Sequence, residues 1–308
     1  MSYAPIALFV YNRPWHTRQA VDSLLSNPGA AQSPLYIFSD APKGVAASQA
    51  VAVAEVRSYI HGIAGFKSVT IVERETNFGL ARSIIDGVSK LCEEYGRVIV
   101  MEDDLVTSPH FLSYMNDALA RYANEDRVMQ IAGYMFPVNL DLKDDALFLP
   151  FTSSWGWATW QRAWRHFDAK GTGHQRLVDD QNLRRAFDLN GNYGYSRMLE
   201  SQLRGETDSW AIRWYLSVFL MNGLTLYPKK TLVGNLGFDG SGVNCVASRV
   251  EESEIEQDFT VDSMPQLISV SDSYGVVLQR FPKPKLNIRT MFNRMRYLFK
   301  SFCNEKNN

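Results

Sequence analysis

The stretch Val98-Ile99-Val100-Met101-Glu102-Asp103-Asp104-Leu105 places three acidic residues directly after four apolar ones. A short, continuous apolar run is typical of a strand that is buried on both faces of a sheet. In open α/β sheets, ligands bind outside the carboxyl ends of the strands, where these acids would lie. Adjacent carboxylates repel one another, and a divalent cation such as Mg²⁺ or Mn²⁺ relieves that repulsion. The stretch therefore predicts a metal site; the alternative is an acidic turn or the charged first turn of a helix.

The residues before and after this stretch alternate between strand and helix patterns. Apolar runs predict further buried strands at residues 6–10, 35–38 and 68–72. Apolar residues at helical spacing predict helices over residues 17–25, 46–63, 80–92 and 109–122. Four strand–helix units in succession predict an α/β fold with a mostly parallel, doubly wound (Rossmann-like) sheet that is flanked by helices.

The second half of the chain has a different, mixed pattern. We expect strands at residues 147–151 and 224–227, and helices over residues 184–203 and 210–221. Trp160 and Trp164 lie four residues apart, which favours a helix there too. A boundary near residues 136–145 divides the chain into segments 1–136, 137–279 and 280–308, although one continuous domain fits the first two segments equally well.

The composition excludes several classes of protein. Of the 308 residues, 45% are hydrophobic and 21% are charged, which argues against a disordered, collagenous or coiled-coil chain. The 32 basic and 33 acidic residues balance, so no electrostatic feature points to nucleic acid as a partner. Three scattered cysteines favour a reducing compartment. Because we find neither a long apolar run nor a basic leader with a cleavage site, we expect a cytoplasmic protein.

The order of motifs along the chain resembles a known family. Glu102-Asp103-Asp104 is similar to the acidic metal motif of the GT-A glycosyltransferases, in the form found in N-acetylglucosaminyltransferase I and its bacterial relatives. Five further segments between residues 5 and 245 also resemble motifs of this family. On the donor side, residues 10–14 resemble the loop after the first strand, residues 38–40 the segment that meets the base or ribose, and residues 77–82 the segment that closes over the nucleotide. On the acceptor side, residues 154–157 resemble the Gly-Trp segment and residues 208–210 the segment that holds the catalytic base.

The resemblance implies a GT-A fold and a metal-dependent, inverting glycosyltransferase. The donor would be a nucleotide-diphosphate sugar, with UDP as the nucleotide, and the acceptor a glycan or lipid-linked molecule in bacterial surface polysaccharide synthesis. Residues 1–136 would bind the donor and residues 137–279 the acceptor. The implied site residues are Glu102 and Asp104 for Mn²⁺ or Mg²⁺; Asn12, Arg13, Asp40, Asn77, Arg82 and Asp103 for the nucleotide; Trp155, Gly156, Trp157 and Asp239 for sugar or acceptor; and Asp208 as catalytic base, with Glu206 as the substitute.

Several of these residues have a plain structural alternative. Asp208 precedes an apolar helix and could be its N-cap, which would lower its pKa and weaken it as a base. Asp40 could form an Asx turn, and Arg82 could pair with Asp86 one helical turn away. Trp157 could belong to the core, as could Trp155, although flat indole faces also suit sugar C–H surfaces. Arg13 is either a fixed charge beside a diphosphate or a surface arginine.

Two segments of the sequence each allow two interpretations. Residues 235–244 contain three glycines and could order over a bound nucleotide, or could form an ordinary connecting loop. Residues 280–300 interleave basic and apolar side chains, which fits either a helix on an anionic membrane surface or a helix packed on the protein.

Two other functions are alternatives to a glycosyltransferase. One is a nucleotidyltransferase, which is disfavoured because residues 10–14 lack glycine, and the other is a non-catalytic sugar-binding protein.

Overall fold

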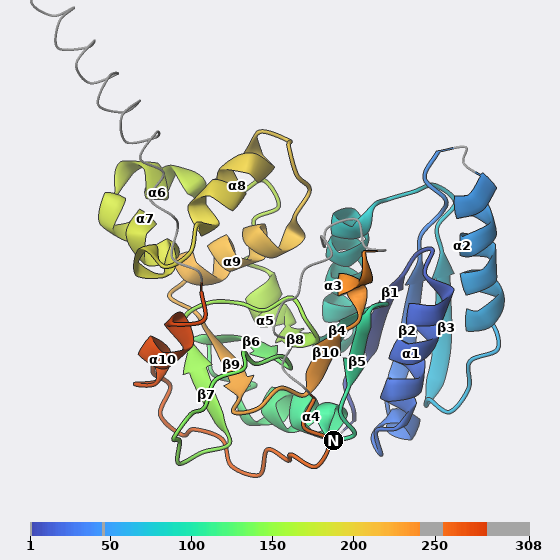
Figure 1. Ribbon diagram of the computed structural model, residues 1–308, viewed down its shortest axis with the longest axis horizontal. Coiled ribbons are helices and arrows are strands. Elements are labelled where there is room, and N and C mark those ends of the chain that lie inside the picture. Colours follow the sequence, from blue (N-terminus) through green and yellow to red (C-terminus); the bar gives the residue numbers. More distant parts are fainter. Residues whose placement is uncertain (1, 45–46, 241–254, 282–308) are drawn as a thin grey trace, which may run out of the picture.

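The computed structural model describes residues 2–44, 47–240 and 255–281, which build one eight-stranded sheet with helices on both faces (Figure 1). The strands lie in the order β3-β2-β1-β4-β8-β6-β9-β7. Their bounds are β1 (Ile6–Val10), β2 (Pro34–Ser39), β3 (Ser68–Glu73), β4 (Arg97–Glu102), β6 (Val128–Ala132), β7 (Ala146–Leu149), β8 (Trp157–Trp160) and β9 (Leu224–Pro228). A separate two-stranded ribbon joins β5 (Leu105–Thr107) to β10 (Val233–Asn235).

The first half forms the parallel part of the sheet, as predicted. β1 pairs in parallel with β2 and β4, and β2 pairs in parallel with β3. The strands alternate with α1 (Pro14–Leu25), α2 (Ala47–Ile60), α3 (Leu80–Tyr95) and α4 (Phe111–Arg121). Pro14 occupies the first turn of α1, where its missing N–H has no helical partner to lose. Gly96 ends α3 with a φ of +74°, a conformation that suits glycine.

The second half adds strands of mixed direction to the same sheet. β8 lies antiparallel to β4 and β6, β9 runs parallel to β6, and β7 closes the edge antiparallel to β9. The helix predicted through Trp160 is wrong, because this residue ends β8 and α5 (Gln161–Trp164) follows it. The segments 1–136 and 137–279 thus share one sheet.

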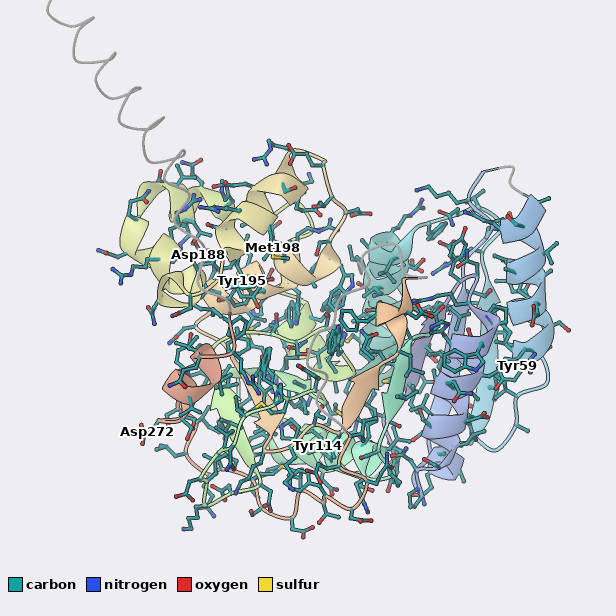
Figure 2. The ribbon with its side chains drawn as sticks, viewed as in Figure 1. Tyr59, Tyr114, Asp188, Tyr195, Met198 and Asp272 are labelled. Carbon is teal, nitrogen blue, oxygen red and sulfur yellow. The ribbon has the colours of Figure 1, made fainter. Side chains whose placement is uncertain are left out.

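The helix predicted over residues 184–203 is interrupted. It divides into α7 (Gln181–Phe187), the 3₁₀ helix η2 (Leu189–Gly191) and α8 (Tyr195–Leu203), with Asn190 in a left-handed conformation between them. Asp188 accepts hydrogen bonds from the backbone N–H and hydroxyl of Ser196 at 2.6 and 2.7 Å, which fixes the start of α8. Figure 2 places Asp188, Tyr195 and Met198 in the helical lobe that also contains α6 (His174–Asp179) and α9 (Trp210–Leu220).

Two apolar layers cover the two faces of the sheet. Because successive side chains of a strand point to opposite faces, Ile6 and Leu8 pack toward α1, α2 and α4, whereas Ala7 and Phe9 pack toward α3. A cluster of four tryptophans lies on the α3 side: Trp157, Trp164, Trp210 and Trp214.

Three short helical elements complete the described part of the chain: η1 (Ala30–Gln32), η3 (Gly237–Asp239) and α10 (Tyr274–Leu278). Within the described ranges, no helix has the length and apolar character that a membrane span needs.

Candidate functional site

The three acids lie at the carboxyl edge of the parallel strands. Glu102 is the last residue of β4, and Asp103 and Asp104 form the turn that leads into β5. The parallel register places Phe9 of β1 beside Glu102, so the residues that follow β1 reach the same edge. The backbone N–H of Tyr11 accordingly donates to Asp103 Oδ2 at 3.3 Å.

Arg13 joins the two aspartates through a single nitrogen. Its Nη2 donates to Asp103 Oδ1 and, at 3.0 Å, to Asp104 Oδ2. All three side chains are largely buried, with exposed fractions of 17% for Arg13, 6% for Asp103 and 12% for Asp104. Although burial alone would lower the pKa of Arg13, the two carboxylates raise it above its usual value, so this arginine stays charged.

The cluster carries more negative charge than Arg13 compensates. Burial and then the neighbouring Asp104 and Asp103 raise the pKa of Glu102 to about 8. Burial also raises the pKa of Asp103 above its usual value, despite the opposing effect of Arg13. Three carboxyl groups therefore share one guanidinium in a buried position, a charge distribution that favours a further cation.

The β5–β10 ribbon brings residues from far along the chain over the acids. The N–H of Leu236 donates to the backbone oxygen of Asp104 at 2.8 Å. A Cβ at Gly237 would lie only 2.4 Å from Asp104 Oδ2 and 3.0 Å from Asn235 Oδ1, so a side chain here would displace one of them. Glycine therefore allows the backbone of η3 to pack closely against the Asp104 carboxylate.

Asp239 and Trp155, both predicted to meet sugar or acceptor, lie next to this ribbon. His16 Nε2 of α1 lies 3.1 Å from Asp239 Oδ2, which ties η3 to the start of α1. Phe238 packs edge-on against Trp155 at 5.5 Å between ring centroids, and Trp155 in turn contacts Tyr134 at 4.5 Å. Asp239 thus lies in η3, and Trp155 contacts η3 through Phe238.

Asp40 and Asn77 make a second cluster at the same edge of the sheet. Asp40 is buried and accepts the backbone N–H groups of Ala41, Phe78 and Gly79 at 2.9, 2.8 and 2.8 Å. Asn77 Nδ2 donates to the backbone oxygen of Ala41 at 2.7 Å. These bonds fasten the end of β2 to the start of α3, and a role in nucleotide binding stays a prediction.

Arg82 does not pair with Asp86, which instead contacts Arg74. Its guanidinium stacks on the Phe78 ring at 3.7 Å from the centroid, and Arg74 approaches the same ring at 4.4 Å. Arg82 is exposed, so its charge remains accessible at the edge where residues 77–79 meet Asp40.

The predicted base, Asp208, has a different environment. Its side chain is 65% exposed, and Arg213 Nη2 of α9 donates to its Oδ1 at 3.0 Å. The N-cap alternative is wrong, because Ser209 caps α9 and accepts the N–H of Ile212. Glu206 is held by Arg204 at 2.7 and 2.8 Å, and those hydrogen bonds lower its pKa to about 2. In the described part of the chain, no hydrogen bond or ion pair joins Asp208 or Glu206 to the acids of β4.

The expectation that Trp157 contacts a sugar is wrong. Its side chain is 0% exposed and stacks on Trp210 at 5.0 Å, so it belongs to the core. Gly156 is buried with a φ of +57°, and a Cβ there would lie 2.7 Å from Val233 Cγ2. Gly156 thus allows the β8 turn to pack against β10.

The residues fit a cation that takes part of its coordination from a ligand. Among residues 2–44, 47–240 and 255–281, no three His, Cys, Asp or Glu side chains are grouped so as to hold a metal ion by themselves. Mg²⁺ typically binds through one or two carboxylates and completes its shell with water and substrate phosphates. The paired carboxylates of Asp103 and Asp104 match that mode of binding.

The sequence-based reasoning missed His16 and the packing role of Gly237. The signal for His16 was weak but present: it occupies the first turn of a helix that begins directly after β1, at the same edge as the acids. Residues 241–254 and 282–308 lie outside the described residues. The first range contains the end of the glycine-rich segment 235–244, and the second contains most of the basic segment 280–300.

In sequence, the chain matches neither a known family profile nor a curated protein. Solved structures of similar fold include the mannosyltransferase PcManGT from Pyrobaculum calidifontis in complex with GDP-Man and Mn²⁺, with 10% identity over 71% of this chain and 69% of that one, and a TM-score of 0.40. TarS residues 1–349 from S. aureus give 13% identity, 75% and 59% coverage, and a TM-score of 0.41. GalNAc-T7 with UDP, GalNAc and Mn²⁺ gives 10% identity, 76% and 44% coverage, and a TM-score of 0.48. The chain thus spans less than two thirds of the length of the latter two.

Proposed function

We propose that this chain is a metal-dependent, inverting glycosyltransferase that uses a nucleotide-diphosphate sugar, with UDP as the nucleotide. The observation that carries the proposal is the pair of buried carboxylates, Asp103 and Asp104, held by Arg13 at the carboxyl ends of β1 and β4. Buried carboxylates at this edge of an open sheet suit a cation that binds together with a phosphorylated ligand.

Asp104 and Asp103 would hold Mn²⁺ or Mg²⁺, with Glu102 behind them. When bound, the cation neutralises charge that develops on the departing diphosphate. Arg13 adds a fixed positive charge and donates hydrogen bonds to the same group, which is the main electrostatic task in sugar transfer. Gly237 lets the chain pass close to Asp104 without a side chain that would displace its carboxylate.

The nucleoside would lie along the neighbouring strand ends. Asn12 follows β1, and Asn77 and Arg82 lie around the junction that Asp40 fastens. Asp40 already accepts three backbone N–H groups, so its contribution in this proposal is to hold the loop at the ribose or base and to offer its remaining lone pairs. The Phe78–Arg82 stack adds an exposed positive charge on that side.

Transfer itself would require Asp208 to take the proton of the acceptor hydroxyl. As that proton leaves, the hydroxyl oxygen bonds to the anomeric carbon, and the bond from that carbon to the diphosphate oxygen breaks. A single direct displacement of this kind inverts the configuration at the carbon. Asp239 of η3 and Trp155, which packs against Phe238 of η3, would contact the sugar or the acceptor.

The acceptor in this proposal is a glycan or lipid-linked molecule of a bacterial surface polysaccharide. The protein would work in the cytoplasm, and the basic tail of residues 280–308 would bring it to the inner membrane face. These statements rest on the family resemblance and on the composition of the tail.

A screen of nucleotide sugars tests the proposed function. The purified protein is incubated with UDP-linked and GDP-linked sugars in Mn²⁺ or in EDTA, and release of the nucleotide diphosphate is measured. We expect slow, Mn²⁺-dependent hydrolysis of one UDP-sugar, which EDTA abolishes. If no nucleotide sugar is bound or cleaved in Mn²⁺, or if a nucleoside triphosphate releases pyrophosphate instead, the proposal is wrong.

A further inference from the structure

Arg13 contacts the same carboxylate oxygens that a divalent cation would need. Its Nη2 binds Asp103 Oδ1 and Asp104 Oδ2 at once, and both carboxylates are nearly buried. A second positive charge placed within hydrogen-bonding distance of these oxygens would be repelled by the guanidinium, and this repulsion is strong away from bulk water. In the described ranges no third acidic or histidine ligand is grouped with them. A cation arriving alone would therefore have to displace Arg13 from these oxygens or bind beside it against its repulsion.

The other terminal nitrogen of Arg13 is in the opposite situation. Nη1 is buried, and it has no hydrogen-bond acceptor among the described residues. A buried donor without an acceptor is costly, and a guanidinium gains most from two parallel bonds to a phosphate or carboxylate. Nη1 is thus a buried donor whose missing acceptor an anionic oxygen of a ligand could supply.

We infer that Arg13 couples the two ligands of the site: in the free protein it occupies the carboxylates in place of a divalent cation, and a diphosphate that binds Arg13 releases them to the cation. This inference rests on the proposed function, because it takes its diphosphate from the nucleotide donor. Arg13 then binds the diphosphate directly and also controls, through Asp103 and Asp104, whether the carboxylates are free for the cation. Metal and nucleotide diphosphate then bind together, and each raises the affinity of the other by the same factor.

Mn²⁺ binding without turnover measures this coupling. Free Mn²⁺ is followed by electron paramagnetic resonance during titration of the full-length protein, with and without UDP. Three proteins are compared: the wild type, Arg13→Gln, and Arg18→Gln. Arg18→Gln is a matched control because it removes the same charge close by in α1, the helix for which Arg13 is the N-cap residue, and because Arg18 contacts Glu55 and Tyr59 instead of the acids.

We expect the wild type and Arg18→Gln to bind Mn²⁺ weakly alone and at least 10-fold more tightly with UDP. Arg13→Gln should bind Mn²⁺ alone about 10-fold more tightly than the wild type, and UDP should add little. Arg13→Lys, which keeps the charge but offers a point charge in place of a planar fork, should fall between the two. A melting curve for each variant shows that it is folded, and Arg13→Lys replaces Arg13→Gln in the comparison if the latter is not.

Two results would overturn the inference and are distinguishable. If Arg13→Gln and the wild type bind Mn²⁺ alone with equal affinity and respond equally to UDP, Arg13 does not couple the ligands, while the proposed function survives. If none of the proteins binds Mn²⁺ with or without UDP, the proposed function fails, and the inference fails with it.

Discussion

The acids at the end of β4 and the acids before α9 are held in contrasting ways. Asp103 and Asp104 are 6% and 12% exposed, and they pair with Arg13, some 90 residues earlier in the chain. Asp208 is 65% exposed and pairs with Arg213, five residues later on the adjoining helix. The sheet therefore fixes the first pair, whereas an exposed local ion pair contributes at most about 1 kcal/mol. Asp208 can leave Arg213 at little cost, which suits a base that must meet an incoming acceptor.

Asp208→Asn should remove the proposed base without disturbing the acids at the end of β4, and we expect it to have the largest effect on activity. General base catalysis contributes about 10²- to 10⁴-fold, so we expect transfer to fall by at least ~100-fold. UDP binding in Mn²⁺ should stay within about two-fold of the wild type, because Asp208 has no bond to the acids of β4. Transfer is measured by UDP release in the presence of acceptor, and binding by calorimetry.

Glu206→Gln is the matched control for this variant, since it changes the neighbouring exposed carboxylate and leaves Asp208 in place. We expect it to retain most of the transfer activity. If Glu206→Gln loses activity and Asp208→Asn keeps it, the base is Glu206, and the assignment of Asp208 is wrong.

Gly237→Ala tests whether the sheet region depends on close packing at Asp104. The added Cβ would lie 2.4 Å from Asp104 Oδ2, so the carboxylate must shift. We expect UDP to bind about 10-fold more weakly in Mn²⁺, measured by calorimetry, with little change in EDTA. Gly275→Ala is the control, because a Cβ there meets nothing within 4 Å. Equal Mn²⁺-dependent binding by both variants would show that Asp104 tolerates displacement.

Glu102→Gln and Glu206→Gln should shift stability in opposite directions with pH, and these effects are the smallest. Burial, followed by the neighbouring Asp104 and Asp103, raises the pKa of Glu102 from its ordinary value of 4.5 to about 8. The folded state therefore holds this proton more tightly than the unfolded state. As the pH rises from about 4.5 to about 8, ionisation of Glu102 lowers the stability of the folded protein. Without metal, Glu102→Gln should raise the melting temperature by roughly 2–4 °C at pH 8.5 and by less at pH 5.

For Glu206 the sign is reversed. Hydrogen bonds from Arg204 lower the pKa of Glu206 from its ordinary value of 4.5 to about 2. The stability that Glu206 contributes is therefore fully present above the ordinary pKa and is lost as the pH falls through the folded-state value. Glu206→Gln should therefore lower the melting temperature slightly at pH 7 and have no effect near pH 2. Equal pH profiles for the two variants, measured by scanning fluorimetry, would contradict the contrast between the regions.

Much of the first half could be predicted because its signals are local. The apolar run at residues 6–10 coincides with β1, and the end of β4 places Glu102 where the strand rule predicts. The spacing of Trp160 and Trp164 misled because β8 and α5 meet between them, so two elements produced one helical period. The break near Asn190 does have a local signal, because Asn190-Gly191 and the nearby Gly194 are typical of turns; the prediction of one helix over residues 184–203 gave that signal too little weight.

The long-range part of the site could not be predicted from patterns. β5 and β10 have three residues each, too few for a period of two to stand out. Their pairing nevertheless brings Gly237 to Asp104 and Asp239 to His16. Trp157 shows the converse, because a residue type that suits a sugar site also suits a core, and only its burial decides between the two.

The central claim is that the aspartates at the end of β4 bind a nucleotide diphosphate together with a divalent cation. Calorimetric titration of UDP into the wild type and Asp104→Asn, each in Mn²⁺ and in EDTA, tests it most directly. The wild type should bind at least 10-fold more tightly in Mn²⁺ than in EDTA, and Asp104→Asn should bind weakly and equally in both. A wild type that does not respond to Mn²⁺, or an Asp104→Asn variant that keeps the full response, would contradict the claim.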